Sequence, residues 1–153
     1  MAAKIVQEAG KYFDCTPMHG KWCTIVLTGQ DVGYAQVGII SSGKHYILFQ
    51  YKDKRGIVAK AYVKYIEEVK ISAWRMRKQQ ELIVEEWDES VNPFSLFLGK
   101  RCDIHVHQTR LFEASPGFFH AKILFVGENI IRIRENGSEY NVNQHMICGM
   151  MEN

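Results

Sequence analysis

The chain has 153 residues, 46% of them hydrophobic, and a formal net charge of +2, which suits one ordinary domain or two small ones. No apolar run approaches the length of a bilayer-spanning helix, and Glu8 stands where a secretory signal would have its apolar centre, so we expect a cytoplasmic protein. The four cysteines show no CxxC spacing, which favours reduced, buried thiols over disulfides or a structural zinc site.

The N-terminal segment carries apolar residues at helical spacing. Ile5, Ala9 and Tyr12 fall on one face of a helix, although Gly10 weakens it. We therefore expect a short N-terminal helix before the first strand.

The next segment alternates apolar and polar residues with a period of two. Cys23, Ile25 and Leu27 alternate with less apolar neighbours, which predicts a half-buried strand with Cys23 pointing inward. A second strand is expected over 35–40 and a third over 46–51, joined by a turn at Gly43 that supplies the positive φ of a tight hairpin. Short fourth and fifth strands follow.

Charge changes sign in the middle of the chain. Residues 51–82 contain nine basic residues against four acidic ones, a balance suited to phosphates or to a solvated face. Residues 85–89 are acidic, and the break at Val91-Asn92-Pro93 marks a connection. Periodicity does not distinguish helix from strand over 74–83.

The second half of the chain repeats the first. Residues 20–27 align with 99–106, sharing Gly, Lys, Cys and Ile, and Cys102 takes the place of Cys23. Residues 39–47 align with 123–131 after a loop four or five residues longer, and we align the closing segments 63–71 and 142–150. The expected fold class is therefore mainly β: two tandem small SH3-like, bent five-stranded barrels with a short N-terminal helix. The expected domains are 1–72 and 96–153, joined by residues 73–95.

A family resemblance appears in two of these segments. Residues 142–150, Val-Asn-Gln-His-Met-Ile-Cys-Gly-Met, resemble the second conserved segment of the bacterial Hfq proteins, and residues 42–49 resemble the hairpin of their first segment. The order of helix and five bent strands is that of the Sm and LSm proteins. The chain thus resembles a tandem, divergent Sm-like protein, although Gly43 and Gly127 stand where the family has Asp, and the Lys-His pair of Hfq becomes Gln144-His145 and Lys64-Tyr65.

The resemblance implies a homo-oligomer that binds single-stranded RNA. Aromatic side chains can stack on bases, and cationic or amide side chains can bind bases or phosphates. The candidate residues are Lys44, His45, Tyr46, Lys64, Tyr65, Asn129, Gln144 and His145. Edge strands of single-domain relatives close rings of six or seven, so three chains with two barrels each give the simplest ring, with a monomer or two-fold dimer as the alternative.

Two other classes of function are weaker alternatives. His105 and His107 after Gly99 fit the opening of the cupin metal signature, but Glu113 lies somewhat farther from His107 than that pattern prefers, and the second segment is absent. No nucleophile elbow, phosphate-binding loop or paired catalytic acids appear, so we expect no enzyme and no cofactor. A structural or adaptor oligomer of viral or mobile-element origin, without nucleic acid, also fits the sequence.

Overall fold

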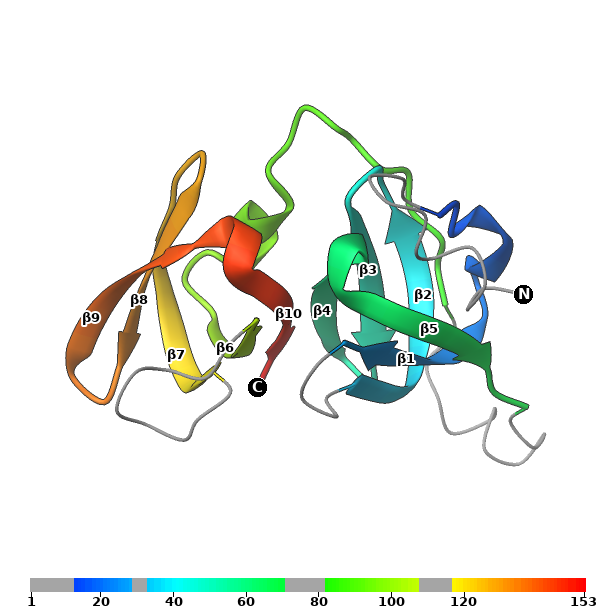
Figure 1. Ribbon diagram of the computed structural model, residues 1–153, viewed down its shortest axis with the longest axis horizontal. Coiled ribbons are helices and arrows are strands. Elements are labelled where there is room, and N and C mark those ends of the chain that lie inside the picture. The colour runs from blue at the N-terminus through cyan, green and yellow to red at the C-terminus, as the bar shows by residue number, and fades with distance from the viewer. Residues whose placement is uncertain (1–12, 29–32, 71–81, 108–116) are drawn as a thin grey trace.

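The computed structural model describes residues 13–28, 33–70, 82–107 and 117–153. Within these ranges the strands form one antiparallel sheet of ten strands, in the order β5-β1-β2-β3-β4-β10-β6-β7-β8-β9 (Figure 1). The expectation of a mainly β protein is therefore confirmed. The predicted N-terminal helix and the ambiguous segment at 74–81 lie outside the described residues.

Five strands come from each half of the chain. The first half contains the short 3-10 helix η1 (Thr16–Met18), β1 (Trp22–Leu27), β2 (Gly33–Ser42), β3 (Tyr46–Tyr51), β4 (Lys54–Ala59), η2 (Lys60–Tyr62) and β5 (Val63–Glu68). The second half contains η3 (Pro93–Phe97), β6 (Arg101–Val106), β7 (Gly117–Val126), β8 (Ile130–Glu135), β9 (Ser138–Asn143), η4 (Gln144–Met146) and β10 (Ile147–Glu152). The strand order within each half is the same, fifth-first-second-third-fourth.

Backbone geometry repeats along with the strand order. Gly20 and Gly99, which precede the first strand of each half, both have a φ of 80°. The Gly20 amide donates to the Ile39 carbonyl and the Gly99 amide to the Ile123 carbonyl, each at 2.8 Å. Left-handed residues also recur at matching places, namely Gln36 with His120 and Lys52 with Asn136. The two halves are therefore structural copies, as the aligned glycines and strands indicated. Gly43 does not have a positive φ, so the prediction that it supplies one to the hairpin turn is wrong; a Cβ there would instead overlap the Trp87 side chain.

The structure changes one part of that alignment. The last strand begins at Val63 in the first half and at Ile147 in the second, each directly after a 3-10 turn. Val63 therefore matches Ile147 and not Val142, so the expected match of 63–71 with 142–150 is wrong: it is shifted by the residues from Val142 to Met146. Apolar residues lie on both sides of each turn, so the sequence alone does not show which apolar residue begins the last strand.

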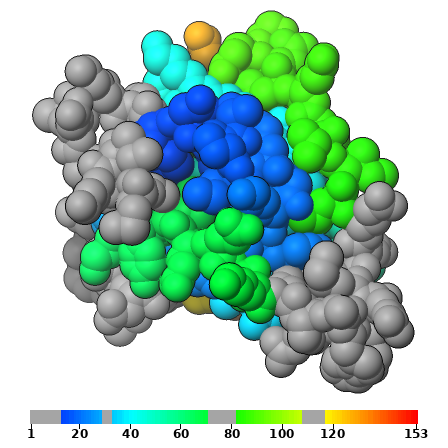
Figure 2. Space-filling view, turned by 90° about the vertical axis from the view of Figure 1, so that its right-hand side faces the viewer, coloured from blue at the N-terminus to red at the C-terminus, as the bar shows by residue number. Residues whose placement is uncertain are grey.

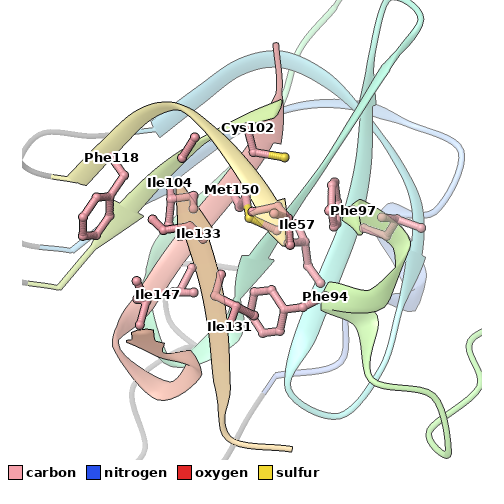
Figure 3. Packing of buried hydrophobic residues seen from close by; sticks show 14 of the residues in the cluster. Ile57, Phe94, Phe97, Cys102, Ile104, Phe118, Ile131, Ile133, Ile147 and Met150 are labelled. Atoms are coloured by element: carbon pink, nitrogen blue, oxygen red, sulfur yellow. The ribbon is translucent and has the colours of Figure 1, made fainter. Parts of the chain in front are cut away.

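Buried side chains form two clusters. The first gathers the inward side chains of β1–β5 with Cys148, and the second gathers those of β6–β10. Cys23 and Cys102 are both fully buried, so the predicted inward positions are confirmed. The second cluster also takes Ile57 from β4 and Phe94 and Phe97 from η3 (Figure 3), so apolar packing continues across the boundary between the halves.

Residues 82–92, here called the connecting segment, run along the outer side of the first half. The Glu85 amide donates to the Ile40 carbonyl at 2.8 Å, and its carboxylate pairs with Arg55 at 2.5 Å. A Cβ at Gly38 would overlap the Leu82 side chain, so the segment is seated closely on β2. Figure 2 shows the connecting segment (bright green) beside the region of η1 (blue).

No helix in the described part of the chain is both long enough and apolar enough to span a bilayer.

Candidate functional site

The two halves meet where β4 pairs with β10. Gly149 lies opposite Val58 and Met151 opposite Gly56, so the fourth strand of the first half pairs with the fifth strand of the second. This pairing satisfies backbone donors and acceptors that an open edge would leave to solvent or to another chain. The C-terminal strand β10 consequently lies between the halves in Figure 1.

Tyrosines of the first half hold this joint together. The Tyr34 hydroxyl lies 3.0 Å from Nδ1 of His105, and the Tyr62 hydroxyl donates to the His145 carbonyl at 2.8 Å. The Tyr62 ring also packs against the His107 ring, with centroids 5.0 Å apart. Burial lowers the pKa of His105, which favours the neutral ring that can share a proton with Tyr34.

A cavity of about 330 Å³, here called the joint cavity, opens between the two halves. Its walls come from the start of β3, the end of β4, and the two equivalent turns η2 and η4. The lining residues are His45, Tyr46, Ala59, Ala61, Tyr62, Gln144 and His145. The volume falls at the lower end of the range of small-ligand sites, which suits one flat group such as a nucleobase.

The side chains of the joint cavity divide into supporting and accessible ones. Gln144 is 5% exposed, and its Nε2 donates to the carbonyls of Gly127 at 2.8 Å and Ile130 at 3.0 Å. Its Oε1 accepts from Asn92, so this amide fixes the hairpin rather than presenting groups to a ligand. His45 and His145, by contrast, are exposed at the mouth of the cavity.

Tyr46 is partly buried, and its ring meets Phe94 edge-on with centroids 5.4 Å apart. The core contact fixes one edge of the Tyr46 ring while the ring still lines the cavity. An aromatic side chain held in this way can stack on a base at a small cost in conformational entropy.

The structure separates the predicted RNA-binding residues into groups. His45, Tyr46, Gln144 and His145 line the joint cavity, and Lys44 directly precedes His45, its backbone amide donating to Glu89 at 2.6 Å. The remaining three candidates, Asn129, Lys64 and Tyr65, lie elsewhere.

Asn129 occupies in the second half the place that His45 has in the first. The backbone amide of Gln144 donates to the Asn129 carbonyl at 2.9 Å, as the backbone amide of Lys60 donates to the His45 carbonyl at 2.8 Å. Lys60-Ala61 is therefore the structural counterpart of Gln144-His145. Lys64 and Tyr65 instead lie on β5, which pairs with β1 on the opposite side of the first half from β4.

Ala59, Ala61 and Tyr62 also line the joint cavity and are not among the residues predicted from the sequence. The signal that would have found them is the apolar residue that begins the fifth strand, because aligning Val63 with Ile147 puts Lys60-Ala61-Tyr62 against Gln144-His145-Met146. Lys60 is itself 5% exposed and donates from Nζ to the Phe13 carbonyl at 2.8 Å. Burial lowers its pKa, and like Gln144 it anchors the turn.

The alternative metal site has little support in this geometry. His105 contacts Tyr34 and His107 contacts Tyr62, so each imidazole has a tyrosine neighbour from the first half. Among the described residues, no group of three or more His, Cys, Asp or Glu side chains is placed to hold a metal ion. Glu113 lies outside the described residues.

In comparisons with known proteins, no family model and no curated protein matches this sequence.

Proposed function

We propose that this protein is a non-enzymatic, tandem Sm-like protein whose two halves are small bent barrels, and that it binds single-stranded RNA in the joint cavity. The observation that carries the proposal is the cavity itself, which brings His45 and Tyr46 from one half beside His145 from the other. The repeated strand order and the resemblance to Sm-like segments support the tandem Sm-like part of the proposal. Both domains and their bounds, 1–72 and 96–153, are part of this proposal.

The side chains of the joint cavity suit an unpaired base better than a duplex. Single-stranded RNA exposes flat bases that stack on Tyr, and exposed His and Lys side chains bind base edges or phosphates. His45 at the mouth and Lys44, the exposed residue before it, supply such groups. A cavity of about 330 Å³ has room for one base but not for a paired helix.

Fluorescence anisotropy with labelled decauridylate and decaadenylate tests the proposal. The double variant His45→Ala/His145→Ala removes two exposed rings from the mouth, and we expect binding to weaken at least tenfold, since each stacked base contributes about 1–3 kcal/mol. Tyr51→Ala removes another exposed aromatic ring, at the far end of β3, and serves as the matched control. RNA binding that is absent, or equally weakened by both variants, contradicts the proposed site.

A second candidate function, a structural oligomer, is favoured by the outer strands. Within the described sheet, β5 and β9 each pair with one strand only. A ring of three chains would place β9 of one copy beside β5 of the next, repeating the fourth-with-fifth pairing that β4 and β10 make within one chain. Both candidates are compatible, because the joint cavity is complete within a single chain.

A further inference from the structure

The outer faces of the two halves are covered differently. On the first half, the connecting segment lies along β2, with Leu82 over Gly38, Glu85 bonded to the Ile40 carbonyl, and Trp87 over Gly43. This stretch is acidic and contains an aromatic residue. The chain itself therefore shows which kind of peptide covers that face.

The equivalent face of the second half is exposed and basic. It is formed mainly by β7 and β8, with one residue from β6, and we call it the basic face. Its exposed side chains are Arg101, Lys122, Phe125, Arg132 and Arg134. Phe125 is 50% exposed, and the Arg132 guanidinium lies 6.0 Å from the centre of its ring.

Positive charges on the basic face are direct neighbours. Arg101 lies opposite Lys122, and Lys122 lies opposite Arg134, so three cations occupy adjacent strands in one row. Like charges directly opposite each other in a sheet destabilise it, and bound anions would relieve that repulsion. Among the described residues, Arg134 of this row pairs with Glu139 at 3.3 Å, with both groups half exposed.

Backbone geometry also matches between the two faces. Ile40 is skipped in the register between β2 and β3, and Leu124 is skipped at the same place between β7 and β8. The Ile40 carbonyl at this bulge accepts the amide of Glu85. By its place at the bulge, the Leu124 carbonyl is the equivalent of this acceptor on the second half.

We propose that the basic face binds an acidic, extended peptide segment of a partner protein along β7, as residues 82–89 lie along β2 of the first half. Lys122 stands where the first half has Gly38, so a carboxylate of the peptide takes the place of the Leu82 side chain there. The carboxylates of the peptide pair with Lys122, Arg132 and Arg134, and an aromatic side chain of the peptide packs on Phe125. An amide of the peptide donates to the Leu124 carbonyl. Positive charges attract phosphates as well as carboxylates, so it is the example within the chain that favours a peptide over a nucleic acid.

A peptide titration against the full chain tests this inference. The probe is a fluorescein-labelled peptide with the sequence of residues 82–90, Leu-Ile-Val-Glu-Glu-Trp-Asp-Glu-Ser. Its control has every Glu and Asp replaced by Gln and Asn. The expected result is binding of the acidic peptide that weakens as salt is added, with the neutral peptide binding at least tenfold more weakly.

Protein variants locate the binding. Arg132→Glu/Arg134→Glu is expected to weaken acidic-peptide binding at least tenfold, whereas Lys52→Glu/Lys70→Glu, an equal charge change at exposed residues of the first half, changes it less than twofold. Arg132→Lys/Arg134→Lys keeps the charge and is expected to retain binding, which separates loss of binding from loss of folding. The inference is overturned if the acidic peptide does not bind, if the neutral peptide binds equally, or if the charge reversal weakens decauridylate binding and leaves peptide binding unchanged.

Discussion

The Tyr34 hydroxyl and Nδ1 of His105 lie 3.0 Å apart, joining the second strand of the first half to the first strand of the second half. Tyr34 also packs on Phe49 inside the first cluster, with ring centroids 4.7 Å apart. Its pKa is raised by burial, so the hydroxyl stays protonated. The equivalent residue of the second half is Phe118, which has no hydroxyl, so this link belongs only to the joint between β4 and β10.

Tyr34→Phe is expected to lower the free energy of unfolding by about 0.5–1.5 kcal/mol, because it removes one hydrogen bond and leaves the ring packing in place. Urea denaturation followed by circular dichroism measures the change. Phe118→Tyr is the matched control, since it adds a hydroxyl at the equivalent position without forming the link. A loss for Tyr34→Phe no larger than the change in this control would contradict a stabilising role.

Acidification is expected to weaken the joint through His105. Burial lowers the pKa of His105 in the folded state, so the unfolded chain binds a proton more readily. The contribution of the neutral ring is complete above the ordinary histidine pKa of about 6.5 and is lost as pH falls through the lower folded value.

Denaturation of wild type and His105→Gln at pH 7.5 and 5.0 measures this contribution, and the pH dependence should be smaller in the variant. His19, whose pKa is also lowered by burial, contributes with the same sign, and His19→Gln gives a control remote from the joint. An unchanged pH dependence in His105→Gln would show that His105 does not cause the loss of stability at low pH.

Gly149→Ala is expected to destabilise the protein by about 1–3 kcal/mol, as overpacking of a filled site does. A Cβ at residue 149 would lie 2.7 Å from the Tyr34 hydroxyl oxygen, closer than real Cβ atoms come to their neighbours. In the background of Tyr34→Ala the same substitution should cost much less. A double-mutant cycle measures this coupling, and additive effects would show that Tyr34 does not fill the space beside Gly149.

The four cysteines should not react with Ellman's reagent in the folded protein. All are buried free thiols, and burial raises the pKa to about 12 for Cys15 and Cys102 and to about 11 for Cys23 and Cys148. Thiolate is the reactive form, so reaction at pH 8 should follow unfolding. Four thiols should react in denaturant, and rapid reaction of any of them in native buffer would contradict this burial.

Association through β5 and β9 is expected to be weaker than the joint within one chain. The residue of β5 that matches Gly149 is Tyr65, whose side chain would meet Phe118 where Gly149 leaves room for Tyr34. Light scattering from 1 to 100 µM should therefore show a mass that rises toward three times the 17.7 kDa of one chain. A constant mass of one chain over this range would reject the ring.

Much of the local structure could be predicted from the sequence. Alternating burial at Cys23, Ile25 and Leu27 follows from the period of two, and the repeat follows from the matching glycines. These features depend on residues close together in the chain, where side-chain pattern and turn chemistry act directly.

The candidate site could be predicted only in part. His45, Tyr46 and His145 were singled out one by one, yet their meeting depends on β4 pairing with β10 rather than with a strand of another chain. The course of residues 82–92 over β2 likewise depends on the space that Gly38 and Gly43 leave for the side chains of the connecting segment, which only the folded sheet shows.

Local residue patterns are enough to predict a mainly β protein with two repeated sets of strands and inward cysteines. The folded chain is needed to see which strand edges join, which residues line the joint cavity, and that one outer face is covered while the basic face is exposed. The physical reason is that strand edges pair through backbone groups that are the same for nearly every residue. The choice of partner strand therefore depends on packing between residues far apart in the sequence, such as Tyr34 against Gly149, which local patterns do not encode.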